Sequence, residues 1–196
     1  MKLASAASCV KAGQRSGQLS GLPRPAIGLL GPAIVHAMTY PVAETRDIAA
    51  PAKTVWELVS DLPRMGEFSP ENVGGKWIKG ATGPAPGAIF SGKNKKGFRR
   101  WKTTATVVEC EPGKVFDIAI SMGPAAIANW RYEFKDIEGG CQVTESWGDH
   151  RKGWMRAVGR PVGVHDGAHA KGEMAATLAS LAQAVEGSSS IGGSTS

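Results

Sequence analysis

The chain has 196 residues, of which 42% are hydrophobic and 20% charged, values typical of one globular domain with flexible ends. Its net charge of +6 is uneven, because residues 1–37 hold four basic side chains and no acidic one, while the rest carries 19 basic and 17 acidic groups. The three cysteines have no metal-ligand spacing, which excludes a disulfide framework or a cysteine zinc site and predicts free thiols in a reducing cytoplasm.

Residues 1–37 are rich in Ala, Gly, Ser and Pro and have no sustained period. Lys11 and Arg15 interrupt the apolar run that a signal peptide needs. We therefore expect a disordered or mis-assigned extension, with Met38 as the more plausible start. No run approaches the roughly 18 apolar residues of a membrane-spanning helix, so we predict no stable membrane insertion.

The middle of the chain alternates between regular runs and turn residues. Residues 41–49 predict a first strand, and the apolar spacing after Pro51 predicts a helix that ends at Pro63. Residues 64–75 are expected to hold only a short turn or helix. The strands expected next are 76–80, 87–93, 98–110, 114–122, 126–137 and 141–149, separated by Gly, Pro and Asn turns.

From about Asp166 to Glu186, apolar residues recur three or four apart and predict a long amphipathic helix. A flexible tail over 187–196 is expected to follow. This order of elements predicts an α+β fold in which a curved antiparallel sheet wraps around the terminal helix, with two short helices after the first strand. Because one helix does not fill the concave side of such a sheet, an internal cavity is expected.

The runs "IAAPAKTVWELVSDLPRMGEFSPE", "GAIFSGKNKKG" and "WRYEF", with the tryptophan of "RRWKTTATVVECEPGKVFDI", resemble the START-like (SRPBCC) superfamily, in particular its polyketide cyclase/dehydrase and lipid-transport branch. The resemblance covers about residues 40–186 and implies the helix-grip fold for a domain over 38–186. Phe68 stands where the pattern usually has Trp. Ligand carriers, cyclases and stress proteins share this scaffold, so the resemblance does not select one function.

The alternation over 141–149 places Glu145 on the same face as Val143 and Trp147. In a solid core, an unpaired carboxylate is costly and is expected to protonate or to find a donor. A hollow filled by water or ligand removes this difficulty, with Glu145 as an acceptor or a general base. A purely structural hydrogen-bonding role is the alternative.

The alternation places Asn94 on the same strand face as Phe90, where its side-chain amide would be a hydrogen-bond donor of fixed direction in such a hollow. Glu145 and Asn94 are therefore the candidate catalytic residues. In an aldol-type cyclisation, Glu145 would abstract a proton next to a ketone, while Asn94 or Tyr132 polarised the carbonyl.

The same alternation predicts a set of side chains that contact a ligand, although a packed core is the alternative for most of them. The set comprises Phe90, Asn94, Trp101, Phe116, Ile118, Trp130, Tyr132, Trp147, Met174 and Leu178. With the resemblance, it predicts a hydrophobic small-molecule ligand such as a lipid, an isoprenoid or a polyketide-like compound. A polyketide cyclase or dehydratase that uses Glu145 is the alternative, and a protein-interaction module is the second alternative.

One further pattern, formed by two histidines and a glutamate, is interpreted as structural. His165, His169 and Glu173 mimic metal-ligand spacing, but Asp166 and Gly167 depart from the metalloprotease motif. We predict no metal and no other cofactor.

The basic run "GKNKKGFRRWK" is predicted to be a charged hairpin tip, too sparse to hold nucleic acid. In the protein-interaction alternative, this hairpin would be the contact. Residues 154–164 are expected to be a packed connector, a lid over the cavity, or a surface that touches a membrane or a second subunit. The pattern leaves the oligomeric state open.

Overall fold

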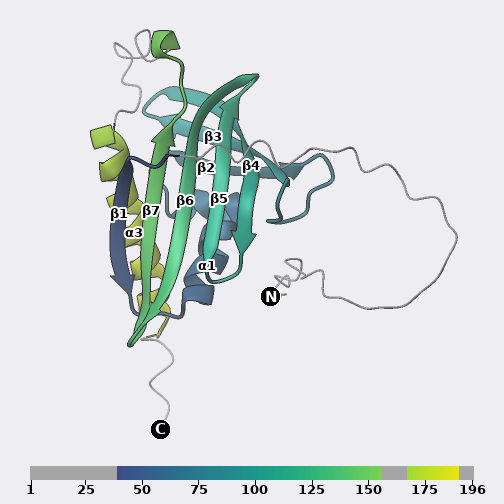
Figure 1. Cartoon of the computed structure of the whole chain (residues 1–196). Coiled ribbons are helices and arrows are strands. Elements are labelled where there is room, and N and C mark those ends of the chain that lie inside the picture. The colour runs from purple at the N-terminus through teal and green to yellow at the C-terminus, as the bar shows by residue number, and fades with distance from the viewer. Residues whose placement is uncertain (1–38, 156–166, 190–196) are drawn as a thin grey trace, which may run out of the picture.

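The computed structural model describes residues 39–155 and 167–189. A seven-stranded antiparallel sheet curves around a long C-terminal helix, α3 (Gly167–Ser189), with α1 (Ala52–Ser60) on the same side (Figure 1). This arrangement confirms the predicted helix-grip fold. The predicted extension, residues 190–196 of the predicted tail and most of the segment 154–164 lie outside the described residues. Residues 187–189, expected to belong to the tail, are the end of α3.

The sheet is an up-and-down meander except at one edge, where the first strand pairs with the last. The strand order is β1-β7-β6-β5-β4-β3-β2. The strands are β1 (Val42–Ile48), β2 (Asn72–Ile78), β3 (Ile89–Lys96), β4 (Arg99–Glu111), β5 (Val115–Met122), β6 (Ala125–Ile137) and β7 (Gly140–Asp149). Because successive strands reverse direction, the β3–β4 turn, the β5–β6 turn and the end of β7 lie at one end of the sheet.

One boundary differs clearly from the sequence prediction. Residues 64–75 were expected to hold only a turn or helix, but β2 begins at Asn72, after the 3-10 helix η1 (Leu62–Glu67). The glycines that resemble a loop form a bulge, at which the β2–β3 register shifts between Asn72 and Gly75. Gly74 has a φ of 87° and donates its N–H to Asn72 Oδ1 at 2.6 Å. Such a backbone favours glycine.

The short helices close one side of the barrel-like sheet. Pro63 lies at the start of η1, where a missing N–H costs no hydrogen bond. Trp56 of α1 packs edge-on against Phe116 of β5, with the two ring centroids 6.4 Å apart. The indole N–H of Trp56 donates to the Val115 carbonyl at 2.9 Å. These contacts place α1 over the concave face, and Leu62 and Met65 of η1 line the space beneath it.

No helix among the described residues is long and apolar enough to cross a lipid bilayer. Of the three cysteines, Cys110 and Cys141 lie in the described part of the chain, and no disulfide joins them to each other.

Candidate ligand cavity

A cavity of about 460 Å³ lies between the concave face of the sheet, η1 and α3. Its wall is mainly apolar and aromatic. Eight residues that the sequence analysis singled out line it: Phe90, Asn94, Trp101, Ile118, Trp130, Tyr132, Glu145 and Trp147. These side chains come from β3, β4, β5, β6 and β7, so the curvature of the sheet brings together residues far apart in the sequence.

Three residues predicted to contact a ligand do not line this cavity. Phe116 is fully buried against Trp56, while Met174 and Leu178 belong to the packed apolar stripe of α3. The helix instead presents the polar residues Glu173 and Thr177, one turn apart, to the cavity. Apolar periodicity identifies the stripe that packs, whereas the cavity lies beside that stripe.

The most unusual group in the cavity wall is Glu145, which is only 2% exposed. It lies directly opposite Tyr132 in the β6–β7 register, and the Tyr132 hydroxyl donates to Glu145 Oε1 at 2.6 Å. Glu145 Oε2 is buried without a hydrogen-bond partner among the described residues. Nearly all buried polar atoms in proteins are paired, so this oxygen points to a ligand or water as its partner.

Burial raises the pKa of Glu145 from 4.5 to about 8, and the negative charge of Glu173 adds to the rise, while the hydrogen bond from Tyr132 opposes it. Burial also raises the pKa of Tyr132, as does the neighbouring Glu145 charge. At neutral pH, Glu145 is therefore mainly a neutral acid that can donate a proton. Above about pH 8 it becomes a base.

Asn94, the other candidate catalytic residue, lies apart from this pair. It is on β3, separated from β7 by three strands, which is about 19 Å along the sheet. Its Nδ2 donates to Thr103 Oγ1 at 3.0 Å. Tyr132, not Asn94, is therefore the group next to Glu145.

A polar network that the sequence analysis missed borders the cavity. Lys96 Nζ lies 2.7 Å from Glu71 Oε1 and 2.5 Å from His169 Nε2, and His169 Nε2 lies 2.9 Å from Glu173 Oε1. The ligand atoms of Glu71, His169 and Glu173 all lie within 4.8 Å of one another, as in a metal site. The ammonium group of Lys96 lies among them and supplies the cation.

The spacing of His169 and Glu173 was visible in the sequence, but Glu71 and Lys96 reach them only through the curvature of the sheet. His165, the other histidine of the predicted pattern, lies outside the described residues. At the same end of the cavity, Arg151 lies in the wall and donates to Asp149 through two bonds of 2.8 Å. Met155, in the segment 154–164 for which a connector, a lid or a contact surface was expected, also lines the cavity.

A curved antiparallel sheet that encloses a cavity against a long C-terminal helix defines the helix-grip class of ligand-binding scaffolds. The sequence profile of the family described as "Polyketide cyclase / dehydrase and lipid transport" matches residues 41–186. The chain belongs to this family, which confirms the resemblance found in the sequence. Membership supports a role in hydrophobic ligand binding or cyclisation.

Solved structures agree with the fold. The Polyketide_cyc-like protein Cgl2372 from Corynebacterium glutamicum is 28% identical over 79% of this chain and 96% of its own, with a TM-score of 0.50. Protein CV1439 from Chromobacterium violaceum is 12% identical over 74% of this chain and 96% of its own, with a TM-score of 0.57.

The di-domain ARO/CYC StfQ from the steffimycin biosynthetic pathway is 10% identical over 76% of this chain and 51% of its own, with a TM-score of 0.57. These last two likenesses concern the fold alone. Among curated proteins, none matches this chain.

Proposed function

We propose that the protein binds a hydrophobic small molecule, such as a lipid, an isoprenoid or a polyketide-like compound, in the cavity. The observation that supports this most is an apolar cavity of about 460 Å³ whose wall includes a buried carboxyl oxygen without a partner. This volume lies within the usual range of small-molecule sites. A ligand that buried about 300 Å² of apolar surface would gain about 7 kcal/mol from the hydrophobic effect, before the cost of association.

The polar groups of the wall would orient such a ligand. Glu145, protonated at neutral pH, would donate Oε2–H to a carbonyl or hydroxyl oxygen of the ligand, since its Oε1 is already bonded to Tyr132. Aromatic rings of Trp101, Trp130 and Trp147 would contact its apolar part.

Titration with long-chain fatty alcohols and flat polyketide-like aromatics, followed by tryptophan fluorescence, tests this function because three tryptophans line the cavity. We expect saturable binding that Ile120→Trp abolishes, since Ile120 also lines the cavity. Val108→Trp is the matched control, because Val108 is 41% exposed and lies outside the lining. Equal binding by both variants would contradict the proposal.

The free Oε2 of Glu145 also favours a second candidate function, a polyketide cyclase or dehydratase. In an aldol cyclisation, ionised Glu145 would remove a proton next to one ketone, and the resulting enolate carbon would form a bond to a second carbonyl. The alkoxide so formed would then take the proton back, which regenerates the carboxylate. Tyr132 keeps the carboxyl oriented through its bond to Oε1.

A poly-β-ketone mimic distinguishes the two functions. As a general base, Glu145 must be ionised, so turnover should rise with pH towards about 8, and Glu145→Gln should lower it at least about 100-fold. Undiminished turnover by Glu145→Gln would exclude this chemistry.

The remaining expectations stay proposals. We place the protein in the cytoplasm, in keeping with the free thiol of Cys141. We also place the folded domain at 38–186, with 1–37 and 187–196 as extensions to it. The third candidate, a protein-interaction module, depends on the basic hairpin.

A further inference from the structure

The positive charge of the chain is concentrated in the β3–β4 hairpin. Between Ile89 and Val108 there are six basic residues and no acidic one. Outside this hairpin and residues 1–38, the chain has 13 basic and 17 acidic residues, a net charge of −4. The basic residues of the hairpin are Lys93, Lys95, Lys96, Arg99, Arg100 and Lys102.

The register of the hairpin places these cations opposite one another. Lys93 faces Lys102, Lys95 faces Arg100, and Lys96 faces Arg99, so three of the four pairs nearest the tip join like charges. Like charges directly opposite in an antiparallel pair are destabilising. Glu71 already offsets the charge of Lys96, from which it lies 2.7 Å away. At the other two pairs, Lys93–Lys102 and Lys95–Arg100, an anionic partner would offset the repulsion.

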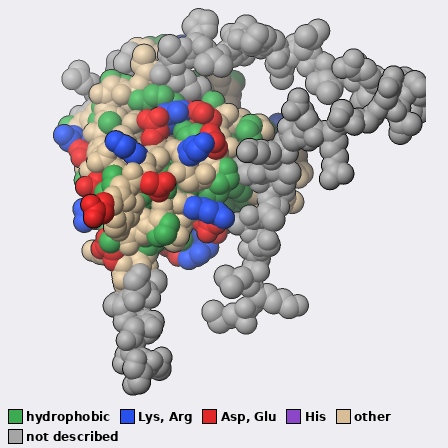
Figure 2. Space-filling view, turned by 60° about the horizontal axis from the view of Figure 1, so that its bottom comes forward, with side chains coloured by type: hydrophobic (Ala, Val, Ile, Leu, Met, Phe, Trp, Pro, Cys, Tyr) green, Lys and Arg blue, Asp and Glu red, His purple; other side chains and the backbone are tan. Residues whose placement is uncertain are grey.

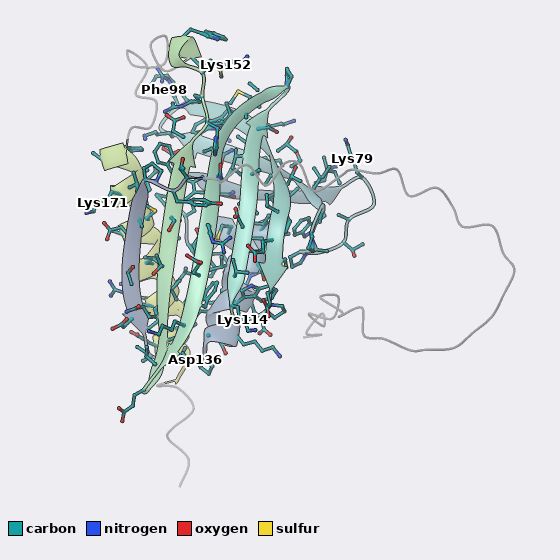
Figure 3. All side chains as sticks on the ribbon, viewed as in Figure 1. Lys79, Phe98, Lys114, Asp136, Lys152 and Lys171 are labelled. Carbon is teal, nitrogen blue, oxygen red and sulfur yellow. The ribbon has the colours of Figure 1, made fainter. Side chains whose placement is uncertain are left out.

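Exposed apolar side chains lie at the same end of the molecule. Phe98 at the hairpin tip is 94% exposed, Met122 at the end of β5 46%, and Trp154 after β7 66%. Figure 3 shows Phe98 and Lys152 at this end, far from Lys114 and Asp136.

Figure 2, which brings the opposite end forward, shows acidic and basic side chains intermixed there. Among the described residues, the exposed aromatic side chains Phe98 and Trp154 lie at the first end, together with the basic hairpin.

The cavity reaches the surface at this end. Arg99 and Met122, both exposed, also line it, and so does Met155 just beyond Trp154. A partner that covered this end would therefore lie over the opening of an apolar cavity.

We propose that this end of the protein docks on the surface of an anionic lipid bilayer, with the exposed cations Lys93, Lys95, Arg100 and Lys102 at the lipid headgroups and Phe98 inserted between them. Cationic side chains and exposed aromatics together are typical of interfacial membrane binding. Nucleic acid would satisfy the charges, and its bases could stack on Phe98, but it would give no role to the opening of an apolar cavity beside them. Passage of a ligand between bilayer and cavity rests on the proposed function, whereas the docking does not.

Sedimentation of the full chain with vesicles tests the docking. We expect binding to vesicles of phosphatidylglycerol and phosphatidylcholine in equal parts, weaker binding to phosphatidylcholine alone, and loss of binding in high salt. Phe98→Ala should lower the partition coefficient about tenfold. The double variant Lys95→Gln/Arg100→Gln should also lower it at least about tenfold.

The double variant Lys114→Gln/Lys135→Gln removes the same charge at the opposite end and should bind like the unmodified protein. Equal loss in both double variants, or no binding to anionic vesicles at low salt, would overturn the proposal. Binding of duplex or single-stranded DNA that the hairpin variant loses, with vesicle binding unchanged, would also overturn it.

Fluorescence titration of the same preparations with a soluble apolar ligand separates the two proposals. Ligand binding without vesicle binding would refute the docking alone. Vesicle binding without ligand binding would refute the proposed function alone.

Discussion

Replacing Glu145 by Gln should change how the stability of the protein depends on pH. Burial holds the pKa of this carboxyl at about 8 in the folded protein, against 4.5 ordinarily. Between these values the unfolded chain releases the proton while the folded protein keeps it. The folded state then binds more protons, so the free energy of unfolding falls as pH rises.

The size of this effect follows from the two pKa values. The difference between the two pKa values corresponds to a decrease of at most about 5 kcal/mol in the free energy of unfolding between roughly pH 4.5 and pH 8. Glu145→Gln keeps an oxygen that can accept the Tyr132 hydroxyl but cannot titrate. Urea unfolding of both proteins across this range measures the effect, because subtracting one free energy from the other cancels all other titrating groups.

We expect the stability of the unmodified protein, relative to Glu145→Gln, to decline by several kcal/mol over this range and to be constant above it. Glu138→Gln, at an exposed position, is the control for removing a carboxylate. A difference that is constant with pH, or that grows as pH rises, would refute a buried carboxyl with a raised pKa.

Three further substitutions test other parts of the structure. Tyr132→Phe leaves Glu145 without its hydrogen-bond donor, so it should destabilise the protein by about 1–3 kcal/mol in urea unfolding and raise the pKa of Glu145 further. Unchanged stability would contradict the hydrogen bond between Tyr132 and Glu145. Lys96→Met removes the ammonium from its Glu–His–Glu site, so zinc should raise the melting temperature of this variant only, and an equal rise in the unmodified protein would contradict that account. Gly140→Ala would place a Cβ 2.1 Å from the Ile48 carbonyl oxygen, so a loss of more than about 2 kcal/mol is expected in urea, and full stability would contradict the β1–β7 contact.

The sequence predicts the sheet and the terminal helix well because period-two and helical patterns record which face of each element is buried. The same logic drew attention to Glu145, since a carboxylate in phase with Val143 and Trp147 indicates either a solvated face or a hollow that needs a polar group. The pattern is local, however. It does not give the β6–β7 register that sets Tyr132 opposite Glu145, and it does not give the strand order that separates Asn94 from Glu145 by three strands.

Two other differences have equally physical causes. Met174 and Leu178 satisfy the helical pattern because they pack, and the cavity lies beside them, at Glu173 and Thr177. Glu71 gives no periodic signal, because its position at the cavity depends on how far the sheet curls.

The central claim is that the cavity holds an apolar small molecule, and native mass spectrometry of the gently purified full chain tests it most directly. The account predicts a discrete mass excess over the denatured chain, extractable into organic solvent and absent from Ile120→Trp. A native mass equal to that of the bare chain, together with no uptake of any apolar compound offered in excess, would contradict it.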